Sequence, residues 1–132
     1  MKHAVFASSV GFAIAVVMIG EAGAESEPYK VREGTQVDAA TLDGWRAWRA
    51  LACERCHGAQ QEGLVGPSLV ESLKHLSKQE FERTLLDGRP DKGMPSFAAS
   101  ATINKNLEGL YAYLKGRSDG AIQPGHLQAL KN

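Results

Sequence analysis

The chain carries no net charge and is poor in cysteine. Of its 132 residues only two are cysteines, Cys53 and Cys56, and 15 basic side chains balance 15 acidic ones. A balanced charge gives no support for binding to nucleic acid or for adhesion to an anionic membrane. Internal repeats and the apolar–polar alternation of strands are also missing, so helices and loops are the expected elements.

The longest apolar run is too short to span a membrane. It extends over about 16 residues, Ala4 to Ile19, whereas a spanning helix needs roughly 20. Lys2 and His3 precede the run, and the small residues Ala22-Gly23-Ala24 follow it. This layout is typical of a secretory signal peptide rather than a membrane anchor. We therefore expect residues 1–24 to be cleaved off and the protein to be periplasmic, with no stable membrane insertion.

The remaining residues divide into an irregular arm (25–40), a helical domain (41–117) and a polar tail (118–132). Apolar residues at three- to four-residue steps predict a helix from Leu42 into the cysteine motif. Further helices are predicted over residues 69–76, after the capping-box sequence Ser77 to Glu80, and over residues 103–115. The expected fold is all-α, with three to four short helices.

Two long loops rich in glycine and proline separate these helices, one after His57 and one over residues 89–100. Loops of this length are uncommon in a small domain unless they wrap something. The apolar side chains on the helices are also few for a self-sufficient core. The sequence therefore predicts that a large, flat, apolar group completes the core.

The sequence C-E-R-C-H over residues 53–57 identifies that group. It could serve as a redox dithiol, a zinc site or a point of covalent haem attachment. A structural zinc site needs four ligands, and His75 and His126 are not paired with the motif. A thioredoxin-like dithiol needs strands around it, which the pattern does not show. C-x-x-C-H is the attachment motif of c-type haem, with Cys53 and Cys56 bonded to the macrocycle and His57 beneath the iron.

A second axial ligand decides what such an iron can do. Met94 is the only methionine outside the leader and lies in a loop between Gly93 and Pro95. Met/His ligation is typical of electron transfer, whereas an open sixth position permits sensing or peroxide chemistry. We expect Met94 as the ligand, with His75 as its main competitor.

Pro67 is predicted to support His57 from the first long loop. An iron-bound histidine normally donates its far ring N–H to a fixed acceptor. A proline carbonyl on a stiff backbone suits this task because the ring fixes φ.

Together these residues resemble the class I c-type cytochromes. The resemblance covers the attachment motif, Gly66-Pro67-Ser68-Leu69, the downstream Met94 and the closing helix around Leu110–Leu114. It implies one covalently bound haem c, a contact of Leu69 with it, and a crossing of the first and last helices through Gly44 and an aromatic residue. Gly44 precedes Cys53 by nine residues where eight are usual, so either Trp45 or Trp48 could make the aromatic contact.

Segments outside the haem motifs resemble one subgroup of these cytochromes. Tyr29-Lys30-Val31, Gly44-Trp45-Arg46 and residues 113–121 are similar to periplasmic cytochromes that accept electrons from PQQ-dependent alcohol dehydrogenases. This resemblance implies such a quinoprotein as donor, and a terminal oxidase or a second cytochrome as acceptor. We expect a monomeric one-electron carrier rather than an enzyme. The alternative is a haem sensor or peroxidase-like protein with a labile sixth position. Arg89 and Lys92 are candidates for binding the haem propionates.

Overall fold

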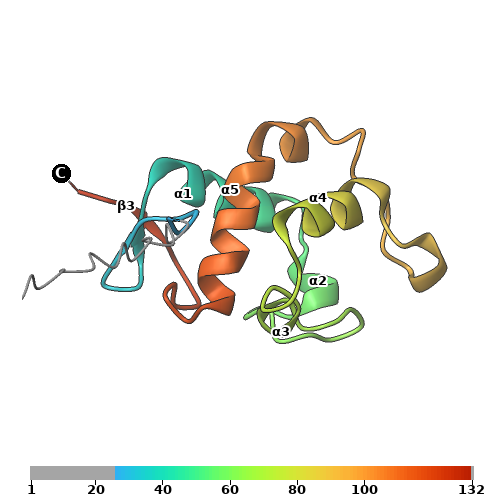
Figure 1. The fold of residues 1–132 in the computed structure, drawn as a ribbon, viewed down its shortest axis with the longest axis horizontal. Coiled ribbons are helices and arrows are strands. Elements are labelled where there is room, and N and C mark those ends of the chain that lie inside the picture. Colours follow the sequence, from blue (N-terminus) through green and yellow to red (C-terminus); the bar gives the residue numbers. More distant parts are fainter. Residues whose placement is uncertain (1–25, 132) are drawn as a thin grey trace, which may run out of the picture.

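The computed structural model of the protein describes residues 26–131, so the predicted signal peptide lies outside the described residues. The fold is mainly helical, as predicted (Figure 1). Its helices are α1 (Ala39–Ala50), α2 (Glu54–His57), α3 (Leu69–Ser72), α4 (Lys78–Asp87), the 3-10 turn η1 (Pro90–Lys92) and α5 (Ala101–Ser118). Among the described residues, no helix is long and apolar enough to cross a membrane.

Two glycines allow α1 and α5 to cross in backbone contact. A Cβ atom at Gly44 would lie 2.0 Å from the carbonyl oxygen of Gly109, and one at Gly109 would lie 2.0 Å from the oxygen of Ala40. Figure 1 shows α5 crossing α1 at the centre of the molecule, with α2 and α3 towards the C-terminal end of α5. The aromatic residue in this crossing is Trp48, whose ring centroid lies 6.4 Å from that of Tyr113.

Gly44→Ala is expected to destabilise the protein by about 3 kcal/mol, because a methyl group at this position must push two helix backbones apart. Thermal or denaturant unfolding of the haem-loaded protein measures the change. Asp43→Ala is the matched control: it alters the neighbouring position and removes only an exposed ion pair with Arg46. Equal stability of the two variants would contradict the close crossing.

The first helix does not run into the cysteine motif, and the prediction of one continuous helix is wrong. α1 ends at Ala50, and Ala52 adopts a left-handed conformation with φ of 52°. The amide of Cys53 instead bonds to the carbonyl of Trp48, at 3.3 Å, before α2 begins. A non-glycine residue with positive φ costs roughly 1–2 kcal/mol, so tertiary contacts must hold the break in place.

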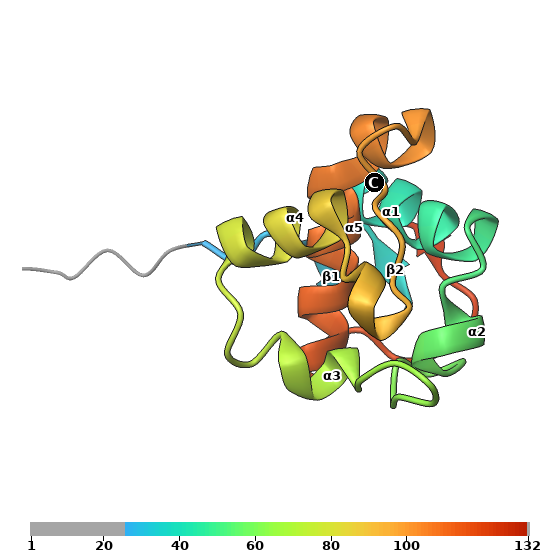
Figure 2. The same ribbon diagram turned by 90° about the vertical axis from the view of Figure 1, so that its right-hand side faces the viewer.

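The capping box that starts α4 is present as predicted. Ser77 Oγ accepts from the amide of Glu80, and the Glu80 carboxylate accepts from the amide of Ser77. Gly88 ends the helix with φ of 73°. Beyond it, the segment of residues 89–100 projects from the side of the molecule that faces the viewer in Figure 2. Two helices differ in length from the prediction: α3 ends at Ser72 rather than at residue 76, and α5 is longer at both ends.

A small sheet joins the arm to the tail. β1 (Val31–Arg32) pairs antiparallel with β2 (Gln36–Val37), and β2 pairs parallel with β3 (Gln128–Ala129). The sequence pattern does not show these strands, because two residues are too few for alternation to be visible. Val37 in β2 and Ile122 in the tail are both fully buried. The arm and the tail therefore both contribute to the core.

Candidate functional site

The cysteine motif forms a tight helical turn that starts immediately after the break in α1. The amide of His57 bonds to the carbonyl of Cys53 at 3.0 Å, which is the hydrogen bond expected four residues apart on a helix. Side chains with this spacing project from one face. Cys53 and His57 therefore share a face, as covalent attachment beside an axial ligand requires.

The two thiols of the motif are not joined to each other. Cys56 is exposed and Cys53 is half-buried. Burial, and then the neighbouring Glu54 carboxylate, raises the pKa of the Cys53 thiol to about 11. Redox-active C-x-x-C pairs instead have a cysteine with a lowered pKa. Cys53 is therefore poorly suited to be the nucleophile of a dithiol redox site.

The His57 ring is held by Pro67. Its Nδ1 lies 2.9 Å from the carbonyl oxygen of Pro67. A carbonyl can only accept a hydrogen bond, so Nδ1 carries the proton and donates it, which leaves the lone pair of Nε2 free for a metal. The ring is buried, and a Cβ atom at Gly66 would lie 2.9 Å from its Cε1 atom. Glycine is thus required at position 66 for the loop to pass so close to the imidazole.

The first long loop folds back onto the motif. Its amides donate to the motif at two points: Gly63 to the carbonyl of His57 and Gly66 to the carbonyl of Cys56, each at 2.7 Å. Leu64 and Val65, between these two anchors, are 73% and 85% exposed. They are the large apolar side chains that the described chain exposes most, and Gly66, which follows them, is bonded to the carbonyl of the exposed Cys56.

The second long loop, which carries Met94, is also firmly held. Arg89 and Met94 exchange two backbone hydrogen bonds, of 2.8 and 3.0 Å, around η1. The amide of Phe97 bonds to the carbonyl of Leu85, which ties the loop to the end of α4. Met94 is half-buried against the core. Such a loop can present a thioether at a fixed position.

The remaining candidate site residues lie at the surface or at the edge of the core. His75 is exposed after α3. Arg89 and Lys92 are exposed too, and Arg89 donates to Thr84 Oγ1 at 3.2 Å. Leu69 is half-buried against the core, and its amide bonds to the carbonyl of Gln61 at 2.9 Å.

Sequence reasoning missed a buried polar network behind the histidine. It consists of Gln61, Tyr113 and Arg117, which are 1%, 3% and 9% exposed. Gln61 donates to Tyr113 Oη at 3.1 Å and accepts from Arg117 Nε at 2.7 Å. The sequence offers no clear signal for it, because glutamine and arginine are mostly exposed in proteins and tyrosine is intermediate.

These residues fit a haem bound on the Cys53–His57 turn. Two thiols without another partner and an imidazole with a free Nε2 lie on one turn. The half-buried apolar side chains around the core come from several elements and suit an apolar macrocycle; they are Leu51, Cys53, Leu69, Leu86, Met94, Phe97, Leu107 and Tyr111. When bound, haem supplies one-electron chemistry through its iron, and this chain supplies its covalent anchors, orientation and shielding from water.

Comparisons with known proteins agree with this arrangement. A family model described as cytochrome C oxidase, cbb3-type, subunit III matches residues 39–114. Cytochrome c-555 of Methylococcus capsulatus is 43% identical, over 70% of this chain and 74% of its own length. Cytochrome c-553I of Paracoccus denitrificans is 31% identical over 74% of this chain, which spans 46% of that protein.

A solved structure resembles the fold as well. It is the c-type cytochrome XoxG of Methylobacterium extorquens AM1, with a TM-score of 0.70 and 30% identity, over 79% of this chain and 67% of that one. The match to the family model covers α1, the attachment turn and α5 as far as residue 114, and the match in structure covers most of the described residues. The chain therefore belongs to the class I c-type cytochromes, which are electron carriers rather than enzymes and hold haem c covalently.

Proposed function

We propose that the protein is a periplasmic electron carrier whose single haem iron is held between His57 and Met94. The observation that carries the proposal is the 2.9 Å contact between His57 Nδ1 and the Pro67 carbonyl. This contact directs Nε2 away from the loop and increases the basicity of the imidazole. Cys53 and Cys56 anchor the cofactor, and Leu69, the first residue of α3, packs against it.

Met94 is proposed as the second ligand because of how its loop is built. The loop is fixed to α4 and to itself through backbone hydrogen bonds. His75, its main competitor, lies exposed beyond α3. A thioether opposite an imidazole raises the reduction potential and closes the coordination sphere. The protein can then exchange an electron without binding a small molecule at the iron.

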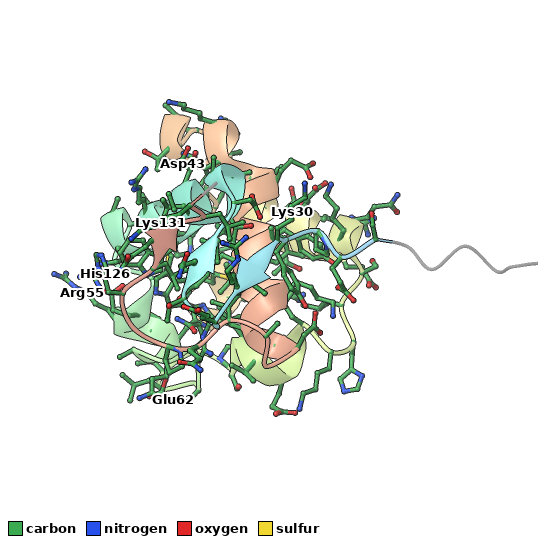
Figure 3. All side chains as sticks on the ribbon, turned by 90° about the vertical axis from the view of Figure 1, so that its left-hand side faces the viewer. Lys30, Asp43, Arg55, Glu62, His126 and Lys131 are labelled. Carbon is green, nitrogen blue, oxygen red and sulfur yellow. The ribbon has the colours of Figure 1, made fainter. Side chains whose placement is uncertain are left out.

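Electrons are proposed to enter beside the exposed Cys56, where Leu64 and Val65 form a small apolar patch. Transient redox complexes use small interfaces, and these two exposed aliphatic side chains are proposed as the centre of the contact. Charges of both signs lie around the periphery in Figure 3, which labels Lys30, Asp43, Arg55, Glu62 and Lys131. Strong long-range steering is therefore not expected.

The proposed donor is a PQQ-dependent alcohol dehydrogenase, and the acceptor a terminal oxidase or a second cytochrome. The support is the similarity of the segments around Tyr29, Gly44 and Tyr113 to cytochromes that serve such enzymes. Export to the periplasm through residues 1–24 and a monomeric state belong to the same proposal. Arg89 and Lys92, which are proposed to bind the haem propionates, lie on the loop that carries Met94.

Stopped-flow mixing tests the donor. The ferric protein is mixed with a purified PQQ-dependent alcohol dehydrogenase that has been reduced by its alcohol, and the second-order rate constant is measured. Val65→Glu is expected to lower this constant about tenfold, equivalent to about 1.4 kcal/mol. Lys30→Gln is the matched control, because it changes the net charge by the same amount. Figure 3 shows Lys30 far from Glu62, which lies three residues before Val65, so this variant should have little effect. A reduction rate that does not depend on enzyme concentration contradicts this donor.

A further inference from the structure

A buried cation lies on the side of the first loop away from solvent. Arg117 is 9% exposed in the last turn of α5. Within residues 26–131, no carboxylate lies close enough to form an ion pair with it. The guanidinium donates to three neutral acceptors: Gln61 Oε1 at 2.7 Å, the carbonyl of Ile122 at 2.6 Å and the carbonyl of Gln60 at 3.1 Å. The C-terminal end of α5 also favours a positive charge here.

The guanidinium joins three segments that are far apart in the sequence. Its planar fork reaches the first loop through Gln60 and Gln61, and the tail through Ile122, from a position on α5. Lysine cannot reproduce these contacts, since it presents one point charge on a flexible stem. A residue needed only to fill space would not have to be charged. The geometry therefore indicates that holding the loop is the role of Arg117.

Gln61 transmits this hold to the histidine. Its backbone carbonyl accepts from the amides of Leu69 and Val70, at 2.9 and 3.3 Å, and from Ser68 Oγ at 3.3 Å. These donors directly follow Pro67 in the chain. The amide of Gln61 bonds to the carbonyl of Gly58, directly after His57. Gln61 is thus connected to both ends of the hydrogen bond between His57 and Pro67.

We propose that Arg117 is a positioning residue for His57. Through Gln61 it holds the first loop in the geometry in which the Pro67 carbonyl accepts from His57 Nδ1. The inference rests on the proposed role of His57 as an iron ligand. If the hydrogen bonds of Arg117 are lost, the first loop moves more freely and the Nδ1–H of His57 is exposed to solvent more often. The imidazole then donates less charge to the iron. Less donation destabilises the ferric state, so the reduction potential rises.

The sign of the potential change separates this role from a purely electrostatic one. Removing a buried positive charge favours the ferric state and lowers the potential. Arg117→Lys retains the charge and removes only the fork. We therefore expect the potential of the lysine variant to rise, whereas a role of the charge alone leaves it unchanged.

The test is hydrogen exchange of the His57 Nδ1–H in the reduced, haem-loaded protein, followed by NMR, together with redox titration. Arg117→Lys should exchange at least tenfold faster than the wild type and show a raised potential. Arg46→Lys is the matched control, since Arg46 is an exposed arginine with only a surface ion pair. Unchanged exchange in Arg117→Lys, or an equal change in Arg46→Lys, overturns the inference.

Tyr113→Phe provides a milder variant in case Arg117→Lys takes up no haem. It removes the hydroxyl that accepts from Gln61 Nε2 and should accelerate exchange two- to fivefold. Unchanged exchange in this variant also overturns the inference. The thioether-to-iron charge-transfer band is recorded for every protein. A wild type without the band contradicts the proposed Met94 ligation, whereas a band in all variants with unchanged exchange overturns only the role of Arg117.

Discussion

His57→Ala is expected to yield little or no folded, haem-loaded protein. The imidazole is buried, and its Nδ1 is bonded to Pro67. Truncating a large buried ring costs about 3–5 kcal/mol, and the stability of a whole domain is only about 5–15 kcal/mol. The variant also leaves the Pro67 carbonyl without its donor and, under the proposed ligation, would remove the histidine ligand of the iron. Cofactor and core should therefore be lost together.

The measurements are a pyridine haemochrome assay of covalent haem and thermal unfolding followed by circular dichroism. His75→Ala is the matched control, because it removes an exposed histidine after α3 and should leave both values near those of the wild type. A stable, cofactor-free helical fold of the His57 variant would show that the core does not depend on the haem.

Under the proposed ligation, Met94→Ala is expected to leave a folded cytochrome whose iron lacks a thioether ligand. The charge-transfer band should disappear, and the reduction potential should fall by about 0.1 V, a fraction of the roughly 0.8 V over which axial ligands set haem potentials. The open position should then bind added small ligands. Optical spectra, redox titration and ligand titration measure the three effects.

Two further variants separate ligation from packing. Met94→Leu retains most of the side-chain volume and should lose the band with a smaller loss of stability. Leu86→Ala removes another half-buried side chain near the start of the same loop and should retain the band. A high-spin ferric spectrum of the intact protein would instead favour the sensor or peroxidase-like alternative.

Local features of the fold could be predicted because neighbouring residues determine them. The capping box needs only Ser77 and Glu80, three residues apart, whose side chains and amides satisfy each other. The turn that presents Cys53 and His57 likewise depends on a spacing of four. The C-x-x-C-H motif predicts the haem group. The 3.6-residue period of the apolar side chains predicts the mainly helical fold.

Features that depend on distant segments could not be predicted in this way. The break at Ala52 opposes local preference, since alanine favours helix and disfavours positive φ. The sheet of the arm and tail pairs segments some 90 residues apart through strands of two residues. Nothing in the tail sequence indicates that Ile122 and Leu127 are core residues.

Arg117 illustrates the difference between features that neighbouring residues determine and features that depend on distant segments. Read along the chain, it is a basic residue near a helix C-terminus, where it suits the dipole and is normally solvated. In the folded protein it is buried among neutral oxygens of the first loop and the tail. By itself, the sequence determined the cofactor, its attachment turn and the helical class, because short-range chemistry specifies them. Only the tertiary structure decided how the loop behind His57 is held, because that depends on three segments which meet only when the chain is folded.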